Sequence, residues 1–405
     1  MNKKKIFKDI SLNMIASFLP ILVLQFLVLP QIALQMPSDQ YGKLLAIIAL
    51  INLTSGSIGS SLNNIRLINF KNDHYVRGAM DFPVFVFMGS ILSVIIFTIT
   101  ANILNYFDNI MNYLISISTS LLMIVATYLV VEFRLRLNYY KILIASIFLA
   151  VGYGVGYYLN YLFEQWLLFL FIGSAMNLAY IYTNVKLPKY RMEFSSYFNY
   201  TLRKLIVLIV SGVLLSSASY VDRLMIYPIL GGTAVSIYYT ASILGKTISL
   251  ALQPFSSVFL SYLAHVEKIK KKDILKIISI VSVLGTFAFI TVSFLGKSVL
   301  SILYPQFVVE ALRYLKITTI TSILIVSSNI LNPILLRFYS FKWQLSINGL
   351  YLCFYIFLSF LLVANNGIMG FCLAALISAL IKFGVMIFII IRETNNKGNV
   401  NNITT

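Results

Sequence analysis

Long apolar stretches follow one another along this chain and leave little polar sequence between them. A membrane-spanning helix needs about 20 mostly apolar residues. The composition agrees with a membrane protein, because 59% of residues are hydrophobic and 11% are charged, whereas soluble domains are about 25% charged. A water-soluble enzyme is excluded, and the sequence predicts an all-α, polytopic membrane protein. The predicted spans number twelve: 10–34, 40–62, 82–105, 110–131, 142–162, 166–185, 205–229, 234–262, 274–296, 315–336, 344–364 and 368–391.

The basic residues predict the orientation. With a cytoplasmic N-terminus, 24 of the 31 lysines and arginines fall in cytoplasmic segments, four fall on the opposite side and three lie inside spans. This alternation follows the positive-inside rule and places both termini in the cytoplasm. The basic segment before residue 9 resembles a signal peptide, but no small-x-small cleavage site follows, so it is interpreted as part of an uncleaved first span. Because topology explains most of the net charge of +18, no nucleic-acid partner is expected.

The connector 186–204 leaves six predicted spans on each side. Such a division is typical of transporters built from two repeated halves around a central site. We therefore expect two six-helix lobes, 1–195 and 196–405, around a central lumen. This connector and the connector 63–81 are both basic and aromatic, and each is expected to lie along the membrane surface as a short amphipathic helix.

Several apparent motifs do not indicate a cofactor. A phosphate-binding loop ending at Lys246 would need glycine at position 240, where the chain has Thr240. The glycines of 152–156 have the spacing that lets membrane helices approach closely, which predicts helix packing. His74 and His265 lack Glu or Cys neighbours at ligand spacing. We expect neither a metal site nor ATP hydrolysis.

Ionisable residues inside spans are the strongest functional candidates, because a charge at the centre of a span costs about 2.5–3.5 kcal/mol on insertion scales. The seventh span contains Asp222 and Arg223. Ser219 and Tyr227 are each four residues from Arg223 and share its helix face. Asp222 is expected to balance Arg223 or to pair with another helix. The alternative is that the two charges cap a short span at its outer edge.

The eighth span carries a polar stripe with steps of three and four residues. A cationic stripe rich in hydroxyl groups would suit a water-filled cavity for an anionic sugar conjugate. Lys382, in the twelfth span, either joins this cavity or extends toward the cytoplasm. Glu132 is expected to form a local ion pair with Arg136, four residues later. The residues of the stripe are Tyr239, Ser242, Lys246, Ser249, Gln253 and Ser256.

Three other spans have features that suit a lumen. The second span is rich in Asn, Ser and Thr, and so is the tenth, which contains Asn329. The first span is interrupted by Pro20 and Pro30 around Gln25. Polar packing contacts between helices are the alternative explanation.

The order of several short motifs resembles the polysaccharide-transporter branch of the MATE/MOP flippase superfamily, in particular the O-antigen flippases called Wzx. One residue of these motifs, Ser236, stands where members of that family frequently have glycine. The motifs are Pro30 followed by Tyr41-Gly42, then Asp222-Arg223, Gly231 and Val235-Ser236-Ile237-Tyr238, then Pro254, and finally Leu303-Tyr304-Pro305-Gln306-Phe307.

The resemblance implies an alternating-access transporter in the bacterial inner membrane that moves an undecaprenyl-diphosphate-linked oligosaccharide to the periplasmic leaflet. By this analogy Arg223 and Lys246 would contact the diphosphate or acidic sugars, and Asp222 would take part in coupling to H⁺ or Na⁺. A polysaccharide polymerase and a chain-length regulator would be the protein partners.

Two rival functions stay open. A multidrug exporter of the same superfamily would favour acidic lumen residues, whereas the ionisable residues within the spans here are mostly basic. A membrane-embedded polysaccharide polymerase or ligase would carry a large periplasmic loop, whereas the longest outer connector, 297–314, is short. A structural scaffold would leave the charges inside the spans unexplained.

Overall fold

The computed structural model describes residues 3–69, 81–107, 109–185, 197–263, 271–338 and 341–403, and these ranges contain helices and no strands. The helices of the N-terminal half are α1 (Lys3–Leu22), α2 (Leu29–Gln35), α3 (Ser38–Ile51), α4 (Ser57–Asn69), α6 (Phe82–Ile103), α7 (Ile110–Leu129), α8 (Val131–Leu135), α9 (Tyr139–Phe163) and α10 (Leu168–Asn184). The others are α11 (Phe198–Leu263), α12 (Lys271–Leu303), α13 (Val308–Phe338) and α14 (Phe341–Ile403). The predicted all-α fold is confirmed.

The twelve predicted spans can be followed in these helices. Ten helical stretches within the described residues are long and apolar enough to cross a membrane. One of them, Ser346–Arg392, contains two predicted spans, and α10, with 17 residues, corresponds to the sixth. The breaks inside the two longest helices fall at glycines with positive φ, which are Gly231 at 81° in α11 and Gly367 at 52° in α14. Glycine adopts this conformation without the steric cost that a side chain would bring.

The first span is interrupted as its prolines predicted. A π-helical segment, Val23–Val28, separates α1 from α2 and contains Gln25. A second π-helical segment, Asn52–Gly56, lies between α3 and α4. Short π-helical segments are rare in proteins overall, and many of those that occur lie at functional sites.

The polar second span is mostly buried inside its own helical unit. The Thr54 hydroxyl donates to the carbonyl of Leu50 (2.9 Å), one turn earlier. The Ser61 hydroxyl donates to the carbonyls of Ser57 (2.7 Å) and Leu208 (3.1 Å), the second of which lies in α11. Polar contacts of this kind account for Thr54 and Ser61, as the alternative explanation anticipated.

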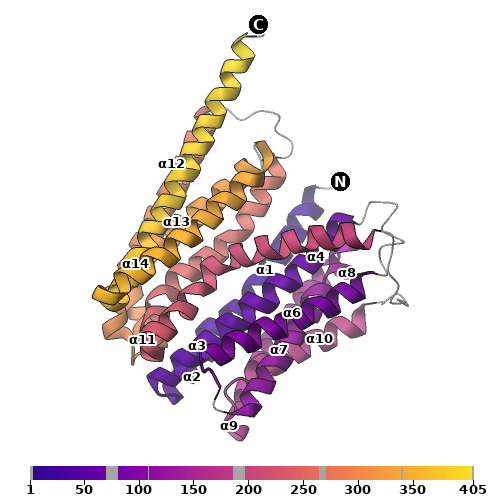
Figure 1. The fold of residues 1–405 in the computed structure, drawn as a ribbon, viewed down its shortest axis with the longest axis vertical. Helices are drawn as coiled ribbons and strands as arrows, with labels where there is room; N and C mark the ends of the chain where they lie inside the picture. The colour runs from indigo at the N-terminus through magenta and orange to yellow at the C-terminus, as the bar shows by residue number, and fades with distance from the viewer. Residues whose placement is uncertain are drawn as a thin grey trace. The chain divides into compact units, whose positions relative to one another are not determined.

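The chain divides into two compact units, 1–232 and 233–405. In the first unit, α10 packs against α9 and α7, and α1 packs against α9. In the second unit, α13 packs against both α12 and α14 (Figure 1). The residues of α11 before the Gly231 break belong to the first unit by their contacts. The division into repeats at residues 195 and 196 stays a prediction.

Glycines determine how closely two helices of the first unit approach. A Cβ on Gly152 would lie 2.6 Å from the Cα of Gly173 in α10, and a Cβ on Gly156 would overlap the Cα of Phe169. Gly154, on another face of α9, has open space around it. The helix packing predicted from the glycine spacing is confirmed.

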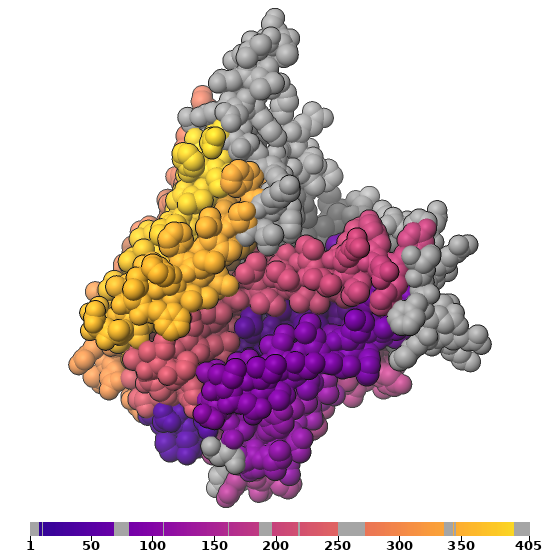
Figure 2. All heavy atoms as spheres, viewed as in Figure 1, coloured from indigo at the N-terminus to yellow at the C-terminus, as the bar shows by residue number. Residues whose placement is uncertain are grey.

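The outer faces of the helices are apolar. Phe87, Ile95 and Ile99 of α6 are 62%, 49% and 55% exposed, and Figure 2 shows this part of the chain, in purple, on the visible surface of the first unit. A face of this kind suits contact with lipid tails. Residues 70–80 and 186–196, which carry most of the two predicted surface helices, lie outside the described residues.

Candidate functional site

Asp222 and Arg223 are buried within α11, at 2% and 7% exposure. The backbone N–H of Arg223 donates to Oδ1 of Asp222 (2.9 Å). The Arg223 guanidinium lies 6.0 Å from the centre of the Tyr220 ring, within the range of a cation–π interaction. The helix begins at Phe198 and breaks only at Gly231. The pair is therefore buried within a continuous helix, and the alternative that it lies at the outer edge of the span stays open.

The polar stripe of the eighth span lies in the second unit. Tyr239 and Ser242 are 1% and 2% exposed, and the Ser242 hydroxyl donates to the carbonyl of Tyr239 (3.2 Å). Ser249 donates to the carbonyl of Ser322 in α13 (3.3 Å). Gln253 lies in α11, and its side chain falls outside the described part of the structure. The hydroxyl hydrogens of Ser242 and Ser249 thus already have backbone acceptors.

The tenth span repeats this pattern of hydroxyl groups that bond to backbone carbonyls. Thr318 of α13 donates to the carbonyl of Ala241 in α11 (2.7 Å). Ser322 donates to the carbonyl of Thr318 in its own helix (2.9 Å). Asn329, farther along α13, is half-buried. The bond of Thr318 to Ala241 and that of Ser249 to Ser322 hold α13 against the part of α11 that follows Gly231.

Lys382 is buried at 4% exposure and does not extend into solvent. Its ammonium lies 5.1 Å from the centre of the Tyr351 ring, also in α14. Within the described part of the chain it has no hydrogen-bond or ion-pair partner. A buried ammonium without a carboxylate is costly unless another interaction offsets its desolvation. Lys382 is therefore a strong candidate for contact with an anion.

Aromatic rings connect Lys382 with Lys246. Starting from Lys382, Tyr351 stacks on Tyr355 with centroids 5.8 Å apart, and Tyr355 meets Phe371 edge-on at 5.4 Å. Phe371 then meets Tyr238 edge-on at 5.4 Å. The ammonium of Lys246, which is half-buried, lies 5.8 Å from the centre of the Tyr238 ring. The structure thus places two of the predicted lysines, from α11 and α14, at opposite ends of one series of aromatic rings. The four rings between them were not predicted from the sequence.

The first unit contains a buried ion pair that the sequence analysis missed. Arg66 of α4 forms an ion pair with Glu132 of α8 and donates from Nη1 to the hydroxyl of Tyr128 (2.8 Å). Arg66 and Glu132 are 3% and 7% exposed. The predicted partner of Glu132, Arg136, is mostly exposed, and its Nη2 lies 3.8 Å from Oε2 of Glu132. The prediction of a local pair identified the weaker contact, because Arg66 had been assigned to the cytoplasmic connector 63–81.

Neither protein-family models nor curated proteins match this chain. Solved structures do. The lipid II flippase MurJ, in an inward closed conformation, is similar with a TM-score of 0.69 and 13% identity over 97% of this chain and 89% of that one. The eukaryotic MATE transporter AtDTX14 is similar with a TM-score of 0.67 and 14% identity, over 96% of this chain and 97% of that one. The Vibrio cholerae MATE transporter VcmN, in its bent form, is similar with a TM-score of 0.60 and 12% identity over 97% of each chain.

These neighbours show that the chain has the fold of the MATE/MOP transporters. The fold and its apolar helices make it a multi-pass membrane protein. The neighbours are transporters and a flippase. At such low identity the likeness concerns the fold, and the substrate has to be argued from the site.

Proposed function

We propose that this protein is a flippase of the bacterial inner membrane, with cytoplasmic termini, that moves an undecaprenyl-diphosphate-linked O-antigen unit to the periplasmic leaflet. One observation carries the proposal. In the second unit, Lys382 is buried without a carboxylate partner among the described residues, and aromatic rings connect it to Lys246. Two cations next to aromatic surfaces suit a ligand that combines a diphosphate with sugar rings.

The proposed cycle needs no covalent chemistry. Alternating access between lobes 1–195 and 196–405 would expose the site to each leaflet in turn, and the protein would act as a transporter, not an enzyme. Lys246, Lys382 and Arg223 would contact the diphosphate or acidic sugars. Asp222 would carry the coupling ion, H⁺ or Na⁺. Weaker polar contacts with the sugars would come from Tyr239, Ser242, Ser249, Gln253 and Asn329.

A charge-reversal series tests the proposal. Lys246→Arg keeps the positive charge, whereas Lys246→Glu places a carboxylate where the diphosphate would bind. Two unit charges 4 Å apart interact by about 4 kcal/mol at an effective dielectric constant of about 20. Lys246→Glu should therefore lose export by more than a hundredfold, and Lys246→Arg should keep most of it. Lys297→Glu is the matched control, because Lys297 is exposed on α12.

The assay measures O-antigen at the cell surface, lipid-linked O-antigen units retained inside the cell and protein abundance in the membrane, in a strain that lacks its own copy. Normal export by Lys246→Glu at normal abundance would remove Lys246 from the substrate path. If loss of the protein left O-antigen intact but sensitised the cells to cationic dyes, the multidrug exporter would be the better function. The polymerase and the chain-length regulator expected as partners can be sought by crosslinking in the same strain.

A further inference from the structure

A cavity of about 440 Å³ lies in the first unit, where several connectors meet. Its wall includes the start of α3, the connector between α6 and α7, the start of α7, the turn between α9 and α10, and α11 near Tyr227. Small-molecule sites in proteins are typically about 300–1,000 Å³. By the predicted topology, this end of the unit faces the periplasm.

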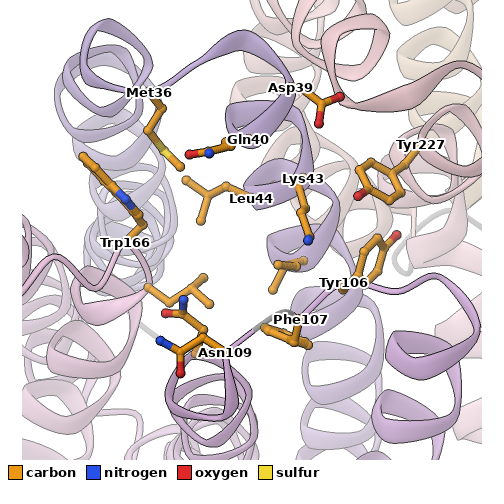
Figure 3. A pocket seen from close by; sticks show the side chains of 13 residues that line it. Met36, Asp39, Gln40, Lys43, Leu44, Tyr106, Phe107, Asn109, Trp166 and Tyr227 are labelled. Carbon is orange, nitrogen blue, oxygen red and sulfur yellow. The ribbon is translucent and has the colours of Figure 1, made fainter.

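Aromatic side chains form two walls of the cavity. In Figure 3, Trp166 lies on one side, and Tyr106 and Tyr227 lie on the other. The rings of Tyr106 and Tyr227 are 5.0 Å apart and meet edge-on. Such amphipathic rings offer an apolar face together with a polar group. The C–H faces of sugar rings are a good match for them.

Two buried polar atoms of the lining lack partners. The hydroxyl of Tyr106, which is 1% exposed, and Oδ1 of Asn112 have no hydrogen-bond partner among the described residues. Burial raises the pKa of Tyr106 above its ordinary value, and neighbouring Tyr227 raises it further. The Tyr106 hydroxyl therefore stays protonated and is able to donate. A ligand with hydroxyl groups would supply both an acceptor for Tyr106 and a donor for Asn112.

The charges of the lining balance each other. Lys43 points into the space between the walls in Figure 3, and Asp39 lies nearby on the same helix. Oδ1 of Asp39 accepts a hydrogen bond from the backbone N–H of Gly232 (2.8 Å). Among the described residues that line the cavity, one cation and one anion balance each other. This distinguishes it from the surroundings of Lys246 and Lys382 and favours an uncharged polar ligand.

From this combination we infer that the cavity binds one or two uncharged sugar residues. If the proposed function holds, on which this role rests, the cavity is an exit site that holds the glycan of the lipid-linked unit at the periplasmic side. The diphosphate and the glycan would then bind to different parts of the protein. The exit site would select for sugar identity, and the lysines would select for the diphosphate.

Tryptophan fluorescence tests the inference directly, because the chain has two tryptophans, Trp166 and Trp343. Trp343→Phe leaves Trp166 as the single reporter on the cavity wall. The purified full-length protein is titrated with a neutral hexose, a 6-deoxyhexose, an N-acetylhexosamine and a hexuronate. We expect a saturable change in emission with at least one neutral sugar and a weaker response to the hexuronate.

Variants in the same single-tryptophan background locate the binding. Tyr106→Phe and Asn112→Leu should each weaken binding about tenfold, which corresponds to 1.4 kcal/mol. Tyr158→Phe and Asn365→Leu are matched controls, because both positions are exposed and outside the cavity lining. If either cavity variant fails to fold, Gln40→Leu replaces it, because Gln40 is exposed and also lines the cavity.

The inference is overturned if no sugar changes the emission of Trp166, or if the cavity variants bind as tightly as the controls. Export in the deletion strain separates this failure from failure of the proposed function. Absence of sugar binding with normal export would refute the exit site and leave the flippase intact. The protein could also bind sugar, with weaker binding in the cavity variants, and yet fail to restore O-antigen. This result would support a saccharide site and refute its role in O-antigen export.

Discussion

The buried pair of Arg66 and Glu132 allows a quantitative test of what holds the first unit together. It connects α4 to α8, and the guanidinium also lies 5.3 Å from the centre of the Tyr128 ring. Removal of one partner of a buried ion pair typically costs about 3–5 kcal/mol, because the other charge is left uncompensated. Glu132→Leu should therefore lower the free energy of unfolding by about that amount.

Two further variants separate the pair from general disruption. Arg66→Met combined with Glu132→Leu removes both charges and keeps similar volumes, and such replacements are often neutral or stabilising. The double variant should recover most of the lost stability. Arg136→Met should change the free energy of unfolding by less than about 1 kcal/mol, because the Arg136 side chain is 56% exposed and its contact is a surface pair.

Denaturant unfolding of the purified protein in mixed micelles measures these differences. The reasoning would be refuted if Arg136→Met were as destabilising as Glu132→Leu, since the local pair would then be the important one. It would also be refuted if the double variant were less stable than Glu132→Leu alone, because the charge of Arg66 would then not depend on Glu132.

Three further predictions follow from particular residues. Gly156→Ala should lower thermal stability in detergent and Gly154→Ala should not, because only the first Cβ would meet α10; equal melting temperatures would contradict this packing. Reporter fusions after Asn109 should give a periplasmic signal and fusions after Lys272 a cytoplasmic one, and the reverse would refute the twelve-span topology. Lys382→Met should raise the melting temperature because it removes a buried cation, and it should abolish export because it removes a proposed substrate contact. A lower melting temperature would point to a structural role.

The sequence predicted the helices well because the membrane imposes a length and a composition on each span. Boundaries were less accurate where polar residues are buried. The second span was predicted to end at residue 62, but α4 continues to Asn69. Its additional polar residues have partners in the unit: Asn63 Nδ2 donates to the carbonyl of Thr127 (2.8 Å), and Asn63 Oδ1 accepts from Arg134 (3.1 Å). A hydropathy window detects apolar residues, and it contains no information on whether a polar residue has a hydrogen-bond partner on another helix.

The candidate site was predictable in part. Periodicity placed Tyr239, Ser242 and Ser249 on one helix, but the acceptors of the two serine hydroxyls are carbonyls of α11 and α13. The rings between Lys246 and Lys382 come from two helices whose contact has no local signal in the sequence. The place of Trp166 in a cavity wall has no local signal either, because it depends on connectors far apart in the chain.

The basic residues of the chain separate into two kinds once their surroundings are known. The sequence assigned Arg66 to a cytoplasmic connector and left Lys382 between a substrate contact and an extension into solvent, yet both are buried. The charge of Arg66 is compensated by Glu132, so its burial is explained by structure alone. Lys382 lies beside the Tyr351 ring and has no carboxylate partner among the described residues, and an aromatic face compensates an ammonium less than a carboxylate does. The proposed anionic substrate would compensate the charge that the fold leaves incompletely compensated at Lys382.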